Sequence, residues 1–278
     1  GNYESGIYSF GTNHNLTITN NLIEGGNCGI YAYASASTRA ENLLIEGNSI
    51  EDVYYSSCYI YYNDGVNFLH NTITADDGLD YYAMGLQMVY SDDFNIIGNK
   101  IGSNYLNGYA YAILLDNCYG SNNPRSQIAN NCLHAGSETS TSYGYNTLYL
   151  YSTGIVDIHH NTMIRHGWSG NTTFYVDNGG LIDIKNNVVA DMSDGYAFQA
   201  YGMFSITSSD HNSFYTTSGN PIYWGTNSYS TIESYQEASG FDLHSVISDP
   251  DFVSEADCTT CNDDIDGGGT HEIGTPPF

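Results

Sequence analysis

The few basic residues of the chain include a group that could act on an acidic substrate. Arg165 and His166 are adjacent, and Lys185 follows Arg165 by 20 residues. A histidine or a lysine can remove a proton as a general base, and neighbouring cations can neutralise an anionic group of a substrate. The sequence also allows a structural role, in which Arg165 and Lys185 form ion pairs with nearby carboxylates such as Asp157 or Asp183.

Two acidic segments could hold a calcium ion through their carboxylates. Tyr81 and Tyr82, beside the first segment, could bind a sugar, because tyrosine offers both a flat apolar ring and a hydroxyl. The alternative for the first segment is a solvated acidic loop, and the second segment lacks EF-hand spacing. The carboxylates belong to Asp76, Asp77 and Asp80 in one segment and to Asp263, Asp264 and Asp266 in the other.

Six cysteines are candidates for disulfide bonds, and six allow fifteen pairings. A bridge from Cys28 to Cys58 would join comparable places in successive parts of the chain, and Cys118 and Cys132 flank one loop. The remaining two form a lone Cys-x-x-Cys, with no second Cys or His pair at zinc spacing. We therefore expect disulfides among Cys28, Cys58, Cys118, Cys132, Cys258 and Cys261.

The elements that position these residues form a repeat, and each copy is anchored on an asparagine. The eight anchors are spaced 23 to 32 residues apart. The residue two after the anchor is apolar in every copy, and the residue three before it is apolar in all but the last copy, which has Ser209. A period in this range indicates a stacked repeat. The anchors are Asn21, Asn48, Asn71, Asn99, Asn131, Asn161, Asn187 and Asn212.

A tight corner is predicted immediately before each anchor. The residue at that place is always Asn, Gly or His, which tolerate a positive φ better than most residues do. Each copy therefore predicts a strand, a corner and a second strand, with the anchor amides hydrogen-bonded from turn to turn in a ladder. We interpret the histidines at this place, His70, His160 and His211, as turn residues.

A third apolar strand follows each corner after a loop of variable length, as in Gly29–Tyr33 and Thr147–Leu150. No helical period is sustained, which excludes leucine-rich and helical repeats. Residues 6–225 resemble the right-handed parallel β-helix proteins, the architecture of pectate-lyase-like enzymes and of many bacterial surface proteins. The resemblance implies an all-β fold: a single-stranded, right-handed parallel β-helix of about eight to nine rungs with an Asn ladder.

The repeat divides the chain into two parts. We expect residues 1–226 to form the β-helix, and residues 227–278 to form a cap and a trailer that packs along it. Gly6–Phe10 parallels Gly29–Tyr33, so the chain begins within a repeat, and we expect more of a longer chain or a second copy to cover that end. A short helix could form between Thr231 and Leu243. The trailer resembles that of secreted bacterial β-helix proteins, which implies export to the bacterial cell surface.

The charge of the chain restricts its partners. The formal net charge is −26, with only 5 lysines and arginines and with 27 tyrosines. Such a chain repels nucleic acids, anionic membranes and polyanionic sugars, unless a cation such as Ca²⁺ bridges them. The sequence has no apolar run long enough to insert into a membrane. The expected partners are therefore extracellular glycans, or the protein itself.

Two classes of function follow from the resemblance. β-Helix lyases use a base and cations, for which Arg165, His166 and Lys185 are the candidates. The 20 residues from Arg165 to Lys185 are close to one turn, so these two side chains could stack as neighbours on one face. β-Helix hydrolases use clustered aspartates, for which Asp76 and Asp77 are the one candidate pair. We favour a third hypothesis: a non-catalytic structural or adhesive module of a bacterial surface protein or fibre, self-associating or glycan-binding. The alternative is a secreted polysaccharide lyase or hydrolase.

Overall fold

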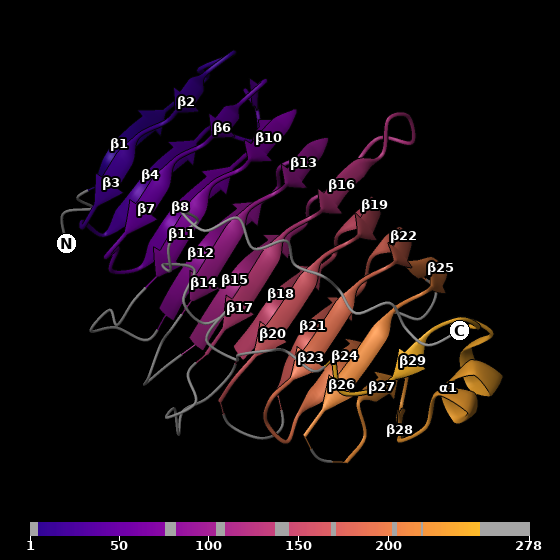
Figure 1. Cartoon of the computed structure of the whole chain (residues 1–278). Helices are drawn as coiled ribbons and strands as arrows, with labels where there is room; N and C mark the ends of the chain where they lie inside the picture. Colours follow the sequence, from indigo (N-terminus) through magenta and orange to yellow (C-terminus); the bar gives the residue numbers. More distant parts are fainter. Residues whose placement is uncertain are drawn as a thin grey trace.

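The chain forms a parallel β-solenoid of about seven turns, shown in a computed structural model (Figure 1). The structure describes residues 5–75, 82–103, 109–136, 145–167, 171–201, 205–217 and 219–250. The turns stack from the amino-terminal strands at one end to the helix α1 at the other. The predicted all-β solenoid is confirmed.

Three sheets run along the solenoid, and each turn contributes one strand to each sheet. The strands of a sheet pair in parallel, except that β28 pairs antiparallel with β27. The first sheet consists of β1 (Ser5–Phe10), β4 (Cys28–Tyr33), β8 (Ser56–Tyr61), β12 (Tyr82–Val89), β15 (Tyr109–Asp116), β18 (Tyr145–Tyr151), β21 (Thr172–Asp177), β24 (Tyr196–Ala200), β27 (Ile222–Trp224) and β28 (Asn227–Tyr229).

The other two sheets meet at the asparagine corner. The second sheet consists of β2 (Thr17–Thr19), β6 (Leu44–Glu46), β10 (Val66–Leu69), β13 (Phe94–Ile97), β16 (Ser126–Ala129), β19 (Gly154–His159), β22 (Gly180–Lys185) and β25 (Ile206–Asp210). The third consists of β3 (Leu22–Glu24), β7 (Ser49–Glu51), β11 (Thr72–Ala75), β14 (Lys100–Ser103), β17 (Cys132–Ala135), β20 (Thr162–Arg165), β23 (Val188–Asp191), β26 (Ser213–Thr216) and β29 (Val246–Ile247). A small extra pair is formed by β5 (Ala40–Glu41) and β9 (Asn63–Asp64).

The corner residues adopt the conformation that their types predict. The residue before each anchor asparagine has a φ between 53° and 69°, in the left-handed region. Asn and Gly reach this region at the lowest cost, and a β-branched residue would be strained there. The residues are Asn20, Gly47, His70, Gly98, Asn130, His160, Asn186 and His211.

The anchor asparagines form one hydrogen-bonded column. The Nδ2 group of Asn131 donates to Oδ1 of Asn161 and to the carbonyl of Ile96, both at 2.9 Å. The backbone N–H of Asn131 donates to the same Oδ1 at 3.1 Å. The link from each Nδ2 to the next Oδ1 is present between all eight anchors. The turn geometry leaves some backbone groups of the corner without a partner in a neighbouring strand. The asparagine amides form hydrogen bonds to these groups.

A second polar column lies at the corner between the first and second sheets, where no repeated residue type in the sequence predicts one. Each of its side chains donates to the carbonyl two residues earlier. Three of the four also donate to a carbonyl of the previous turn, and the Oγ of Ser91 accepts from the N–H of Asn63 there. Each follows a residue with positive φ. The column consists of Asn63, Ser91, Cys118 and Thr153, so four residue types share one structural role.

The disulfides expected from the sequence are not formed among the described cysteines. No bond joins Cys28 to Cys58, or Cys118 to Cys132. The register explains the first pair, because Cys28 lies beside Ser56 and Cys58 lies beside Ile30. The second pair is separated because Cys118 points into the corner column, whereas Cys132 lies on β17 between Lys100 and Thr162. Cys258 and Cys261 lie outside the described residues.

A helix and a short strand follow the last repeat. The helix α1 (Ile232–Ser239) lies where the sequence allows one, and the Oγ1 of Thr231 caps it by accepting from the N–H of Ser234. The chain then rejoins the third sheet through β29, which pairs with β26. Ser245 takes the place of the next ladder asparagine, because its Oγ accepts from the N–H of Asn212 at 2.8 Å. The segment from 242 to 247 thus forms a partial turn on the end of the solenoid.

Candidate functional site: the outer tyrosine face

The predicted base-and-cation group is not assembled as the sequence suggested. Arg165 is fully buried at the end of β20, where its Nε lies 2.7 Å from Oδ2 of Asp191, itself fully buried. Its Nη2 donates to Oδ1 of Asp191 at 3.0 Å and to Oγ of Ser193 at 2.6 Å. A guanidinium enclosed in this way holds two turns of the third sheet together and is screened from a polymeric substrate.

The 20-residue spacing from Arg165 to Lys185 does not correspond to one turn. One turn after Arg165 in the third sheet is Asp191, 26 residues later. Lys185 ends β22 in the second sheet, beside His159 and Asp210. The expectation that Arg165 and Lys185 stack as neighbours is therefore wrong, because the loops between strands differ in length from turn to turn.

Two buried histidines lie beside the Arg165 site. His166 and His134 are nearly inaccessible, and their ring centroids are 5.3 Å apart. Burial first, and then the charge of His166, lowers the pKa of His134 to about 3. Neither ring nitrogen of His134 has a hydrogen-bond partner among the described residues. His134 is therefore a neutral core residue at ordinary pH.

Several other predicted site residues lie outside the described part of the chain. These are Asp76, Asp77, Asp80, Tyr81, Asp263, Asp264 and Asp266. Tyr82 begins β12, where its backbone lies beside that of Tyr109.

Aromatic side chains gather on the outer face of the first sheet, a candidate binding surface that we call the outer tyrosine face. Outward positions recur every second residue along its strands, and parallel pairing brings the same positions of successive turns together. Tyr31 thus lies between Tyr8 and Tyr59, and Tyr33 lies between Phe10 and Tyr61. The face consists of a first block, Tyr8, Phe10, Tyr31, Tyr33, Tyr59 and Tyr61, and a second block, Tyr149, Tyr151, Tyr175, Tyr201 and Tyr223.

The rings of the first block are stacked along the solenoid. Centroids of successive turns are 5.0 to 5.3 Å apart, and the ring planes agree within 12°. The spacing follows the distance between neighbouring strands, about 4.8 Å. Because each ring covers the face of the next, the block presents ring edges and hydroxyl groups outward. In the second block, Tyr149 and Tyr175 stack at 4.8 Å, and Tyr201 bridges Tyr175 and Tyr223 with edge contacts.

Two turns between the blocks lack tyrosine at the two positions aligned with Tyr59 and Tyr61. There β12 has Gln87 and Val89, and β15 has Leu114 and Asp116. These side chains are smaller than tyrosine, and Val89 is buried. At these two positions the columns of aromatic rings are therefore interrupted over two strands, or about 10 Å.

The outer tyrosine face is largely uncharged in a strongly acidic protein. Burial, the hydrogen bond with Tyr62 and the neighbouring tyrosines raise the pKa of Tyr61 to about 12. Burial and neighbouring groups also raise the pKa values of Tyr59 and Tyr175. The hydroxyls stay protonated and can both donate and accept hydrogen bonds. The alternation of tyrosines, as in Tyr31 and Tyr33, is the sequence signal for this face, whereas the tyrosine candidates predicted from the sequence are Tyr81 and Tyr82.

Comparison with protein-family models, curated proteins and solved structures gives no match to this chain. The solenoid is thus established by the strand pairing itself. No helix of the described residues is long and apolar enough to cross a membrane.

Proposed function

We propose that the protein is a non-catalytic, extracellular β-solenoid module that binds a neutral glycan on its outer tyrosine face. The observation that carries the proposal is the double column of stacked tyrosines in the first block. Its location at a bacterial cell surface follows from the resemblance to surface β-helix proteins and from the acidic composition. The bound polymer would make the module an adhesive or structural part of a surface protein.

The chemistry of the face suits a sugar polymer. Polysaccharides present apolar C–H groups and hydroxyls in alternation, and tyrosine edges with protonated hydroxyls complement both. A ligand that follows the solenoid axis meets the same group at every turn of the first block, so that weak contacts can add along the polymer.

The charge of the protein selects against acidic polymers. A net charge of −26 repels a polyanion at long range. The outer tyrosine face holds Asp116 and Asp177 but no lysine or arginine at its described outward positions. A neutral glycan therefore fits better than a uronate polymer, and no cation is needed to bridge it.

The burial of Arg165 counts against the alternative of a lyase. A lyase needs its base and its cations in contact with the sugar, but Arg165 and His166 lie inside the solenoid. Lys185 alone remains outside, on a different sheet from the outer tyrosine face. The structure thus favours binding over cleavage.

The experiment is affinity electrophoresis against a panel of neutral polysaccharides, with pectate and alginate as acidic members. We expect the protein to be retarded by at least one neutral polymer, and the double variant Tyr31→Ala/Tyr175→Ala to lose most of the retardation. Tyr119→Ala is the matched control, because Tyr119 is an exposed tyrosine outside the outer tyrosine face.

Retardation by no polymer of the panel would overturn the proposal, as would equal retardation of the double variant and the native protein. Cleavage of any member, followed by the release of unsaturated or reducing ends, would favour the enzyme instead. The retardation of Tyr31→Phe then separates the role of the ring from that of the hydroxyl, because this variant keeps the stacked ring and lacks only the hydroxyl.

A further inference from the structure

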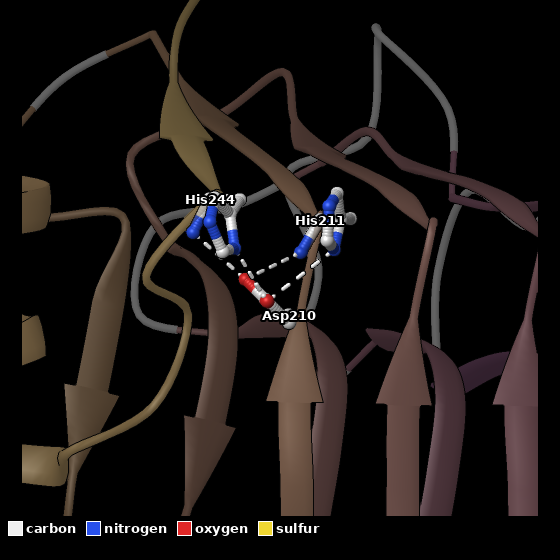
Figure 2. Close-up of side chains that lie close together, drawn as sticks. All are labelled: Asp210, His211 and His244. Carbon is white, nitrogen blue, oxygen red and sulfur yellow. Dashed lines mark hydrogen bonds and ion pairs between the residues drawn. The ribbon is translucent and has the colours of Figure 1, made fainter.

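Asp210, His211 and His244 form a cluster at the carboxyl-terminal end of the asparagine corner (Figure 2). Asp210 ends β25, and His211 is the left-handed corner residue that follows it. His244 comes from the partial turn after α1, and it lies directly over His211 because Ser245 continues the ladder above Asn212. The two imidazole rings are stacked, with centroids 4.8 Å apart and planes within 20°.

One carboxylate oxygen faces both imidazoles. Oδ2 of Asp210 lies 2.8 Å from Nδ1 of His244 and 3.3 Å from Nδ1 of His211. Figure 2 shows the carboxylate below the edges of the two rings, with dashed lines from its oxygens to both histidines. A candidate ligand atom from each of the three residues lies within 4.8 Å of the other two.

The second carboxylate oxygen of Asp210, Oδ1, fixes the orientation of the Asp210 carboxylate. Oδ1 of Asp210 accepts from the backbone N–H of His244 at 2.7 Å and of His211 at 2.9 Å. Such outer hydrogen bonds are the usual support of a carboxylate that ligates a metal. Because backbone amides hold Oδ1, Oδ2 is presented to the imidazoles in one position.

We propose that Asp210, His211 and His244 bind a divalent transition-metal ion of the zinc type. Two ligands about 2.1 Å from a tetrahedral ion lie about 3.4 Å apart, close to the 3.3 Å and 2.8 Å between the nitrogens and Oδ2. Two imidazoles and one carboxylate suit Zn²⁺, Ni²⁺ or Cu²⁺ better than Ca²⁺ or Mg²⁺, which prefer oxygen ligands. The exposed imidazoles leave the fourth position to water.

The ion would stabilise the carboxyl-terminal end of the solenoid. Its ligands come from β25 and from the partial turn that carries β29, which are 33 residues apart in sequence from His211 to His244. A bound ion would therefore join the last complete turn to the segment that covers it. This role is independent of glycan binding on the first sheet.

Zinc chloride titration of the full chain tests the site, with two readouts. The imidazole resonances of His211 and His244 in two-dimensional NMR should shift together with one equivalent of zinc, and the melting temperature should rise. Asn is the natural substitution, because other turns carry Asn at this corner. His211→Asn and His244→Asn should each weaken binding at least about tenfold and should abolish the rise in melting temperature.

His70→Asn is the matched control, because His70 occupies the same corner next to Leu69 instead of an aspartate. Asp210→Asn keeps an oxygen for the backbone amides and should also weaken binding. Absence of zinc-induced shifts at His211 and His244 would overturn the proposal. So would unchanged zinc affinity in His211→Asn and His244→Asn, because the ion would then be bound elsewhere.

Discussion

At the scale of single residues, Arg165 shows how a side chain suited to catalysis can be used for structure. Its guanidinium and the Asp191 carboxylate are both fully buried and are joined by two hydrogen bonds. Removing water from two charges is costly, and their attraction repays that cost only while both partners remain. The pair therefore favours one arrangement of β20 and β23 over others.

The buried pair yields a prediction on stability. Arg165→Met should lower the free energy of unfolding by about 3–5 kcal/mol, because Asp191 is left charged and unpaired. The double variant Arg165→Met/Asp191→Leu should recover most of this loss. Chemical denaturation followed by circular dichroism measures both. A double variant as unstable as the single one would show that packing of the arginine, and not its charge, dominates.

His134 should make the stability depend on pH. Its folded pKa is about 3, whereas an exposed imidazole titrates near 6.5, so the unfolded chain binds the extra proton between these values. The stability is therefore highest, with respect to His134, above about pH 6.5, and it decreases as the pH falls below that value. Roughly 3 kcal/mol should be lost by about pH 4.

Denaturation midpoints of the native protein and of His134→Leu, measured from about pH 7 to about pH 4, provide the test. The variant should have the shallower pH dependence, and His14→Leu, which replaces an exposed histidine, should follow the native protein. Parallel curves for the native protein and His134→Leu would contradict the assignment of this linkage to His134.

At the scale of elements, the ladder corner is the device that fixes the register of the solenoid. A one-residue slip of any strand would move a buried apolar row to the outside and would break the asparagine column. Both penalties act on the same strands, for example on Ile128 and Asn131 in the turn of β16 and β17. The corner therefore couples local turn geometry to packing.

The ladder yields a further prediction on stability. Asn131→Ala leaves the carbonyl of Ile96 and the amide groups of Asn99 without their partner. Each unsatisfied buried group costs about 1–3 kcal/mol, so the variant should lose at least about 3 kcal/mol. Asn95→Ala is the control, because Asn95 lies outside the ladder and bonds only to the side chain of Asn67. Equal losses in both variants would contradict a special role for the ladder.

The two corners show how far sequence reasoning reaches. The asparagine corner is predictable because one residue type repeats and a residue tolerant of positive φ precedes it. The other corner is not, because Asn63, Ser91, Cys118 and Thr153 perform the same hydrogen bonding with different side chains. The same limit explains the error at Arg165 and Lys185: turns of 23 to 32 residues do not reveal which sheet a given residue reaches.

At the scale of the whole molecule, the solenoid converts a sequence pattern into a long, regular surface. Every strand of the first sheet contributes outward positions at fixed intervals, and tyrosines occupy them in two blocks. The chain has a formal net charge of −26, which opposes the approach of anionic polymers. A solenoid with one largely uncharged, hydroxyl-rich face is consistent with the proposal that a neutral polymer binds along its length.

Tyrosine footprinting tests the central claim most directly. The native protein is oxidised by hydroxyl radicals with and without the neutral polysaccharide that retards it, and the modified residues are identified by mass spectrometry. We predict that the polymer protects Tyr31, Tyr59 and Tyr175, and leaves Tyr119 as reactive as before. Protection of Tyr119 with no change at Tyr31, Tyr59 and Tyr175 would contradict glycan binding on the outer tyrosine face.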